Sequence, residues 1–302
     1  MTGGADTRLA VAPARSYSED SRHAHGAINT PLSNTGGIPQ DVWEDSEELL
    51  SDGADIWLKC KQRQSRGLVH VDWLSFSIRT IKERVEGCAW QLAERLAELT
   101  NGEISEGNGA HFYARSLKVY SADTMLAIVY FSGEHQRNTV HVSIPGAAWL
   151  TSDFSFNQKI YDLLVEFGVE HLSRIDLARD CFDGESNFAS MVDAFDEGKF
   201  KPSRGVSPSI WTIQDERRGS TCHVGRRENG KLILGYEKSM QLARKDGWFR
   251  VELELRSVNR RIPLEAVLDP AAYFAGSCKY LAELAETSCV QRVATFRKST
   301  EL

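Results

Sequence analysis

Paired cysteines, long apolar runs and a leader-like N-terminus are all missing from this sequence of 302 residues. None of its six cysteines lies in a CxxC pair, which argues against a zinc ribbon or a disulfide scaffold and favours a reducing compartment. No stretch approaches the roughly 18 continuous apolar residues that a membrane helix needs, and no apolar signal region follows Met1. The sequence therefore predicts a cytoplasmic protein without a membrane partner.

Positive charge is in deficit overall: the formal net charge is -6. The charges are unevenly distributed along the chain. Acidic residues gather in the segment DVWEDSEELLSDGAD, whereas the segment 201–261 contains the basic clusters KPSR, ERR, GRR, ARK and VNRR. A local basic excess is compatible with binding to nucleic acid, although a solvated surface gives the same pattern.

Three parts of the chain differ in composition. Residues 1–53 are rich in Ser, Gly, Asn, Asp and Pro and lack periodic apolar residues, so we expect a disordered acidic tail. Residues 54–277 carry regular apolar patterns and form the expected functional domain. Residues 278–302 are expected to form a C-terminal helix over 279–296, which follows another helix over 263–276.

Within this domain, strand and helix patterns follow one another in blocks. Two-residue alternation predicts strands over 68–78, 111–121, 124–133, 138–146, 171–184, 208–214, 220–227, 231–238 and 248–257. Helical spacing of apolar residues predicts helices over 79–99, 157–170 and 186–198. We therefore expect an α+β fold with an antiparallel sheet and helices packed on one face, for which two related α/β halves are one arrangement.

Charged side chains lie on one face of three predicted strands. Successive side chains in a strand point to opposite faces, so each strand separates these charges from its apolar residues. The charged face of 171–184 carries Arg174, Asp176 and Asp180, that of 248–257 carries Arg250, Glu252, Glu254 and Arg256, and the strand 68–78 adds Asp72.

If these strands are neighbours, Asp72, Asp176 and either Glu252 or Glu254 would converge. Clustered carboxylates repel one another and are commonly held together by a divalent cation. Oxygen-only ligands favour magnesium or manganese. The alternative is that the acids face solvent or pair with arginines on neighbouring strands, as on an ordinary sheet surface.

The strand 231–238 ends with a tyrosine and a lysine two residues apart. Tyr236 and Lys238 would share a face, and an ammonium group can stabilise a phenolate or neutralise a phosphate. The alternative is that Tyr236 is a packing residue. Gly219 and Gly225 flank the preceding strand, where the backbone could approach a ligand closely.

Four segments in order carry a family resemblance: VDWLSFSI, SRIDLARDCFDG, GSTCHVGRRENGKLILGYEKSMQL and WFRVELELRS. They contain the patterns R-x-D-x-x-x-D, G-x-x-x-x-x-G-R, Y-x-K and R-x-E-x-x-L. Over residues 68–275 the chain resembles the replication initiation factor family of rolling-circle plasmids and filamentous phages. Tyrosine relaxases of integrative conjugative elements are related to this family.

The resemblance implies a rolling-circle replication initiator that nicks and rejoins one DNA strand through a covalent 5′-phosphotyrosine. Tyr236 is then the nucleophile, with Lys238 beside it, and Asp72, Asp176 and Glu252 hold magnesium or manganese. The implied partners are origin DNA, single-stranded or supercoiled, and the host helicase and polymerase, with a homodimer possible. The implied DNA contacts are Arg174, Arg226, Arg227 and Arg250.

One position departs from the family pattern, and three other readings stay open. The family often has arginine two residues before its tyrosine, where this chain has Leu234. The same chemistry would serve a relaxase of a mobile element, and the same fold without activity would serve a DNA-binding regulator. His23-Ala24-His25 matches superficially the His-hydrophobic-His metal motif of other rolling-circle initiators, but no strand pattern surrounds it.

Overall fold

The structure is a computed structural model that describes residues 47–64, 67–136, 138–202, 206–215, 217, 219–242, 244 and 246–296. The predicted acidic tail lies outside these residues, except that its end, 47–53, is the first part of helix α1 (Glu47–Gln64). The motif His23-Ala24-His25 also lies outside them. No helix in the described part of the chain is both long enough and apolar enough to cross a membrane.

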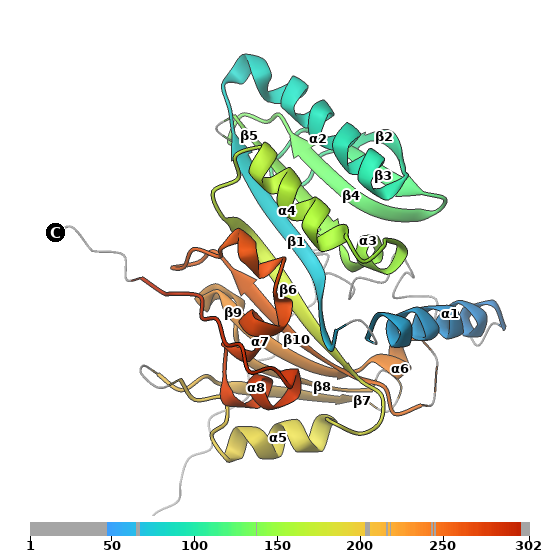
Figure 1. Ribbon diagram of the computed structural model, residues 1–302, viewed down its shortest axis with the longest axis vertical. Helices are drawn as coiled ribbons and strands as arrows, with labels where there is room; N and C mark the ends of the chain where they lie inside the picture. Colours follow the sequence, from blue (N-terminus) through green and yellow to red (C-terminus); the bar gives the residue numbers. More distant parts are fainter. Residues whose placement is uncertain are drawn as a thin grey trace, which may run out of the picture. The chain divides into compact units, whose positions relative to one another are not determined.

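One antiparallel sheet organises the described residues, in the strand order β2-β3-β4-β5-β1-β6-β10-β9-β8-β7 (Figure 1). Its first five strands in the chain are β1 (Val69–Arg79), β2 (Glu103–Asn108), β3 (Arg115–Ser121), β4 (Thr124–Phe131) and β5 (Thr139–Pro145). The other five are β6 (Leu172–Cys181), β7 (Ile210–Asp215), β8 (Gly219–Arg226), β9 (Lys231–Glu237) and β10 (Phe249–Arg256). The predicted α+β class with an antiparallel sheet is confirmed.

The two halves of the sheet have the same topology. In the first half, β1 is followed by helix α2 (Val85–Thr100) and by β2 to β5, and β5 returns to pair with β1. In the second half, β6 is followed by helix α5 (Phe188–Asp196) and by β7 to β10, and β10 returns to pair with β6. The antiparallel pair β1–β6 joins the halves, so the sheet contains a repeated strand–helix–four-strand unit.

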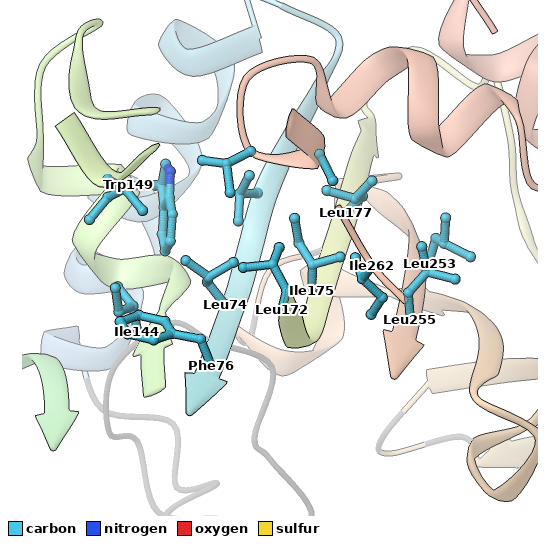
Figure 2. Packing of buried hydrophobic residues seen from close by; sticks show 14 of the residues in the cluster. Leu74, Phe76, Ile144, Trp149, Leu172, Ile175, Leu177, Leu253, Leu255 and Ile262 are labelled. Atoms are coloured by element: carbon cyan, nitrogen blue, oxygen red, sulfur yellow. The ribbon is translucent and has the colours of Figure 1, made fainter. Parts of the chain in front are cut away.

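The apolar core lies on one face of this sheet, under most of the helices. Figure 2 shows Leu74 and Phe76 of β1, Ile175 of β6 and Leu253 of β10 in one continuous layer across the junction of the halves. Figure 1 shows α2, α4 (Phe156–Glu166) and α7 (Pro270–Ala275) in front of the strands. The short helices α3 (Gly146–Thr151) and α8 (Lys279–Ala285) contribute further buried side chains to this layer.

Side chains of α1 meet the charged side chains of the sheet instead. Arg63 of α1 lies against His70 of β1 and Asp180 of β6. The short helix α6 (Lys238–Gln241) directly follows β9. Thus Lys238 is not the last residue of the strand, as the alternation predicted, but the first residue of a helix.

The C-terminal helix is shorter than predicted. Helix α8 ends at Ala285, and Glu286 then adopts the left-handed conformation with φ of 50°. The chain beyond it crosses α7, where the Gln291 amide donates to the Ala272 carbonyl at 2.9 Å. The following residues Thr287, Ser288 and Val290 are weak helix formers, so this crossing contact is preferred to a longer helix. Strand β2 and helix α3 were not predicted at all.

Candidate active site

A β-bulge in β1 turns Asp72 toward the charged face of the sheet. The pairing of β1 with β6 shifts register between Val71 and Trp73. As a result, Val71 before the bulge and Leu74 after it both lie in the core, although regular alternation would place them on opposite faces. Bulges commonly re-aim side chains beside functional sites.

Arg250 joins two of the acids at the end of this face. It is fully buried, and its guanidinium donates to Asp180 at 2.6 and 3.0 Å and to Asp72 Oδ1 at 3.1 Å. Burial alone would raise the pKa of each carboxyl, but Arg250 and then His70 lower both pKa values below the usual range. Arg250 was predicted as a DNA contact. Its burial and its two carboxylate partners instead suit a role in holding the site together.

Tyr236 and Glu252 face each other across β9 and β10. Tyr236 is 6% exposed, is paired in register with Arg250, and donates its hydroxyl to Glu252 Oε2 at 3.3 Å. Burial raises the pKa of Glu252 well above its usual value, and the nearby carboxylates of Asp176 and Asp72 raise it further. When ionised, a carboxylate with a raised pKa is a stronger base, and Glu252 lies within hydrogen-bond distance of the tyrosine hydroxyl.

The surroundings of Glu254 are different, which separates the two candidate acids. Glu254 accepts from Arg227 at 2.9 Å and from Arg256 at 2.5 Å, and Arg174 lies 3.5 Å away. Burial favours a higher pKa for Glu254, but Arg174 and Arg256 outweigh it and lower the pKa. The sequence could not distinguish Glu252 from Glu254, because both lie on one face of the strand. The structure places Glu252 beside the tyrosine and surrounds Glu254 with arginines.

Asp176 lies between these two environments. Arg174 donates to both of its carboxylate oxygens, with 2.9 Å between Nε and Oδ1. Burial raises the pKa of Asp176 to about 6, because it and the charges of Glu254 and Asp72 together exceed the lowering effect of Arg174. Arg174, a predicted DNA contact, is largely buried, and its guanidinium stacks over the Trp73 ring at 5.0 Å.

Lys238 is buried next to the tyrosine. Its ammonium lies 5.8 Å from the centroid of the Tyr236 ring and donates to Gln241 Oε1 at 3.1 Å. Burial and then Arg250 lower the pKa of Lys238 to about 8, against the opposing effect of Asp72. The predicted proximity of this lysine to Tyr236 is therefore present, although it comes from a helix start rather than from the strand.

The donor chemistry of the three predicted ligands fits a divalent cation. Asp72, Asp176 and Glu252 supply only oxygens, and their mutual repulsion contributes to the raised pKa values of Asp176 and Glu252. In their present positions, however, no three His, Cys, Asp or Glu side chains of the described residues form a group that could hold a metal ion. Arg174 and Arg250 occupy oxygens of Asp176 and Asp72, so metal binding requires these side chains to move.

Two residues that the sequence analysis missed complete the charged face. Arg63 Nη2 lies 2.6 Å from His70 Nε2 and 3.5 Å from Asp180 Oδ2. The Nε and Nη1 atoms of Arg63 are buried and have no hydrogen-bond partner among the described residues. Burial, and then the charge of Arg63, lower the pKa of His70 well below its usual value. No local sequence pattern predicts the contacts of Arg63 with His70 and Asp180, because they form only when α1 packs on the sheet.

The two arginines after Gly225 differ in their surroundings, and Arg227 contacts a residue of the charged face. Arg226 is exposed, and Arg227 is half-buried in its ion pair with Glu254. Gly225 has φ of 93°, and a Cβ there would lie 2.7 Å from the Lys231 carbonyl oxygen. At Gly219, with φ of 81°, a Cβ would lie 2.8 Å from Glu237 Oε2. Both glycines adopt a positive φ, and at Gly225 the paired strand β9 leaves no room for a Cβ.

Comparison with known proteins gives one family match and a structural likeness. Residues 170–300 match the model of the family described as replication initiation factor, which confirms the predicted resemblance over that segment. The segment includes Asp176, Tyr236, Lys238 and Glu252 but not Asp72. A structure described as the rolling circle replication initiator protein from Geobacillus stearothermophilus is 21% identical, with a TM-score of 0.48, and covers 69% of this chain and 81% of its own. No curated protein matches the sequence.

Proposed function

We propose that this protein initiates rolling-circle DNA replication by nicking and rejoining one strand of its origin, with Tyr236 as the nucleophile. The observation that carries the proposal is the contact between the Tyr236 hydroxyl and Glu252, at 3.3 Å, within a buried cluster of acids and cations. The family match over residues 170–300 supports the same function. That match supports DNA replication as the process in which the protein acts.

The residues around Tyr236 account for a transesterification in which every proton transfer has a donor and an acceptor. Tyr236 Oη attacks the scissile phosphorus while Glu252 accepts the phenolic proton, and the bond from phosphorus to the 3′ oxygen breaks. The 3′ oxygen takes up a proton from solvent and leaves as a hydroxyl, Glu252 returns the phenolic proton to solvent, and the 5′ phosphate stays on Tyr236. In the reverse reaction, a 3′ hydroxyl attacks the phosphotyrosine and the DNA is resealed without ATP.

Cations around the tyrosine are suited to the phosphate. The Nε and Nη1 nitrogens of Arg63, described above, are buried donors that a phosphate oxygen would satisfy. Lys238 contributes positive charge near the Tyr236 ring, which favours a phenolate during attack. Arg226, which is exposed, and Arg227 lie where they can contact the DNA backbone outside the buried cluster.

A divalent cation, magnesium or manganese, would be held by Asp72, Asp176 and Glu252. When bound, it would polarise the scissile phosphate and offset developing negative charge. Arg174 and Arg250 would then have to release carboxylate oxygens to the ion. The partners we propose are single-stranded or supercoiled origin DNA and the host helicase and polymerase, with the protein acting as a monomer or a homodimer.

The test is covalent capture of DNA by the full-length protein. Purified protein is incubated with single-stranded and supercoiled origin DNA with magnesium, with manganese or with EDTA, and adducts are resolved on denaturing gels. We expect a metal-dependent adduct that is absent in Tyr236→Phe. Glu252→Gln should slow adduct formation by about 10²- to 10⁴-fold, as expected for loss of a general base. Glu254→Gln, the matched control, should lower stability more than it lowers the rate measured on folded protein.

Three outcomes would contradict parts of this proposal. An adduct that persists in Tyr236→Phe would assign the nucleophile to another residue. An adduct that forms equally well in EDTA would remove the metal from the reaction. Tight DNA binding without any adduct would identify a DNA-binding regulator with the same fold.

A further inference from the structure

The repeat in the sheet gives the candidate active site a counterpart in the first half of the chain. Tyr236 of β9 is paired with Arg250 of β10, which is paired with Asp180 of β6. In the same order of strands, Tyr130 of β4 is paired with His141 of β5, which is paired with Ser77 of β1. Each tyrosine is the penultimate residue of the fourth strand of its half.

The counterpart keeps the tyrosine but replaces the charged groups with neutral ones. Glu252 lies two residues after Arg250 in β10, and the equivalent position in β5, two residues after His141, is Ser143. Burial and then His111 lower the pKa of His141 to about 4, so this ring is neutral at neutral pH. The first half therefore has no equivalent of the acids used for chemistry.

Aromatic rings gather at this counterpart site. The rings of Tyr113, Tyr130 and His141 are mutually stacked, with each pair of centroids 6.2 Å apart. The His111 ring meets the Tyr130 ring edge-on at 5.5 Å. We call these four residues the aromatic platform. Tyr113 is half-buried and His111 exposed, whereas Tyr130 forms the more buried base of the platform.

A strained turn presents one edge of the platform. Tyr113 donates its amide to the Ala110 carbonyl at 2.9 Å, and the two residues between them, His111 and Phe112, have φ of 55° and 66°. Turns with two such residues strongly favour Asn-Gly, because a side chain makes positive φ costly. Here the turn instead displays a histidine and a phenylalanine that is 83% exposed. Such strain is typical of functional segments.

Contacts on one face connect the platform to the candidate active site. Arg174, which holds Asp176, stacks over Trp73, whose indole donates to Ser75 Oγ at 2.7 Å. Ser75 then contacts Ser143 at 3.1 Å, and Ser143 lies 3.4 Å from His141 Nε2. From the strand pairing, the line from Tyr236 to Tyr130 crosses about five strand spacings and about eight residues along the strands, on the order of 35 Å.

We propose that the aromatic platform binds single-stranded DNA by stacking on the bases of the strand that flanks the nick. Neutral stacked rings suit bases of any sequence, since every base has a π-face, and folds that bind single strands use such rings over about 4–16 nucleotides. The line of polar contacts leads from the cleavage chemistry to these rings on the same face. Lys118 of β3, on the face shared by Ser116 and Tyr130, is available for the DNA backbone. The inference rests on the proposed function for its choice of DNA strand.

The test measures binding of fluorescent single-stranded oligonucleotides to the full-length protein, separately from adduct formation. Tyr113→Leu should weaken binding at least about five-fold, the lower limit for loss of one stacking ring, whereas Tyr113→Phe keeps the ring and should bind normally. Tyr161→Leu, at a half-buried tyrosine of α4, is the matched control and should bind normally. Oligonucleotides extended by about 10 nucleotides on either side of the nick would show which flank is bound.

A second variant avoids loss of folding as an explanation. His111→Asn with Phe112→Gly gives the turn its preferred residues, so its melting temperature should be unchanged or higher while single-strand affinity falls. Photocrosslinking with iodinated bases should label residues 111–141 in the wild-type protein.

The proposal is overturned if Tyr113→Leu and the turn variant bind single strands like the wild type. It is also overturned if the variants lose affinity for duplex DNA as much as for single strands. The same holds if the platform variants leave single-strand affinity unchanged and alter self-association or binding to another protein. An oligonucleotide that covers only the nick does not reach the platform, so adduct formation on it tests the role of Tyr236 alone. An adduct lost in Tyr236→Phe together with unchanged affinity in Tyr113→Leu would therefore reject the platform alone.

Discussion

At the scale of single residues, the charged face is a set of buried groups whose protonation depends on one another. Asp180 accepts hydrogen bonds from Arg250 and from Trp248 Nε1 at 2.8 Å, and Arg63 lies 3.5 Å away. Asp180 was seen in the sequence as one of several charges on a strand and was not predicted as a site residue. In the structure it holds Arg250, which in turn contacts Asp72, so Asp180 acts on the site by positioning that arginine.

We predict that Asp180→Asn destabilises the protein by about 3–5 kcal/mol near pH 7, because it leaves a buried guanidinium without its counter-charge. The pKa of Asp180 is lowered in the folded state, so its stabilising effect is fully present above the unfolded pKa of about 4. That effect is lost as the pH falls through the lower folded value. The gap in unfolding free energy between wild type and variant, measured in urea, should therefore narrow below about pH 4.

The matched control for this prediction is Asp196→Asn, at an exposed position at the end of α5. It should change the unfolding free energy by less than about 0.5 kcal/mol at any pH. An equal effect of both substitutions, or an Asp180→Asn penalty that grows on acidification, would show that the Arg250 network contributes no specific stability.

At the scale of elements, the packing of β9 against α5 explains the residue before the tyrosine. A Cβ at Gly235 would lie 2.3 Å from Met191 Sδ and 2.8 Å from the Phe249 ring. The side chain of Tyr236 points to the opposite face, so close packing under Gly235 fixes how near β9, the strand that carries Tyr236, lies to α5. The sequence pattern alone did not predict this packing role for the glycine.

We predict that Gly235→Ala destabilises the protein by about 1–3 kcal/mol, the usual cost of overpacking a core. Met191→Ala should relieve the clash, so that the double variant is less destabilised than the sum of the single variants. The measurement is urea denaturation of the four proteins. Gly87→Ala in α2, where a Cβ meets nothing within 4 Å, is the control and should stabilise by up to about 1 kcal/mol. Strictly additive losses would refute the clash.

At the scale of the described domain, the two repeated halves share one sheet and one core. The β1–β6 pair runs through the junction, and the core layer in Figure 2 continues from Ile144 of β5 to Leu255 of β10. Separation of the halves would expose the apolar residues of both central strands. The halves are therefore expected to unfold together, although each repeats the topology of the other.

We predict a single cooperative thermal transition, with equal calorimetric and van't Hoff enthalpies. Leu96→Ala in the first half and Ile233→Ala in the second each remove a buried core side chain and should cost about 2–5 kcal/mol. Both should shift the whole transition to lower temperature. A second transition that moves in only one of the variants would show that the halves unfold independently.

Most of the strands and helices, though not β2 or α3, followed from sequence periodicity, because alternation and helical spacing record which side of each element is buried. The family resemblance, carried by motifs that are contiguous in the chain, pointed to Tyr236 and the acids. Periodicity does not determine the register, that is, which residues of neighbouring strands are paired. The bulge at Asp72, the separation of Glu252 from Glu254 and the docking of Arg63 depend on which strands and helices become neighbours. These pairings join residues that are far apart in sequence, so only the tertiary structure decided them.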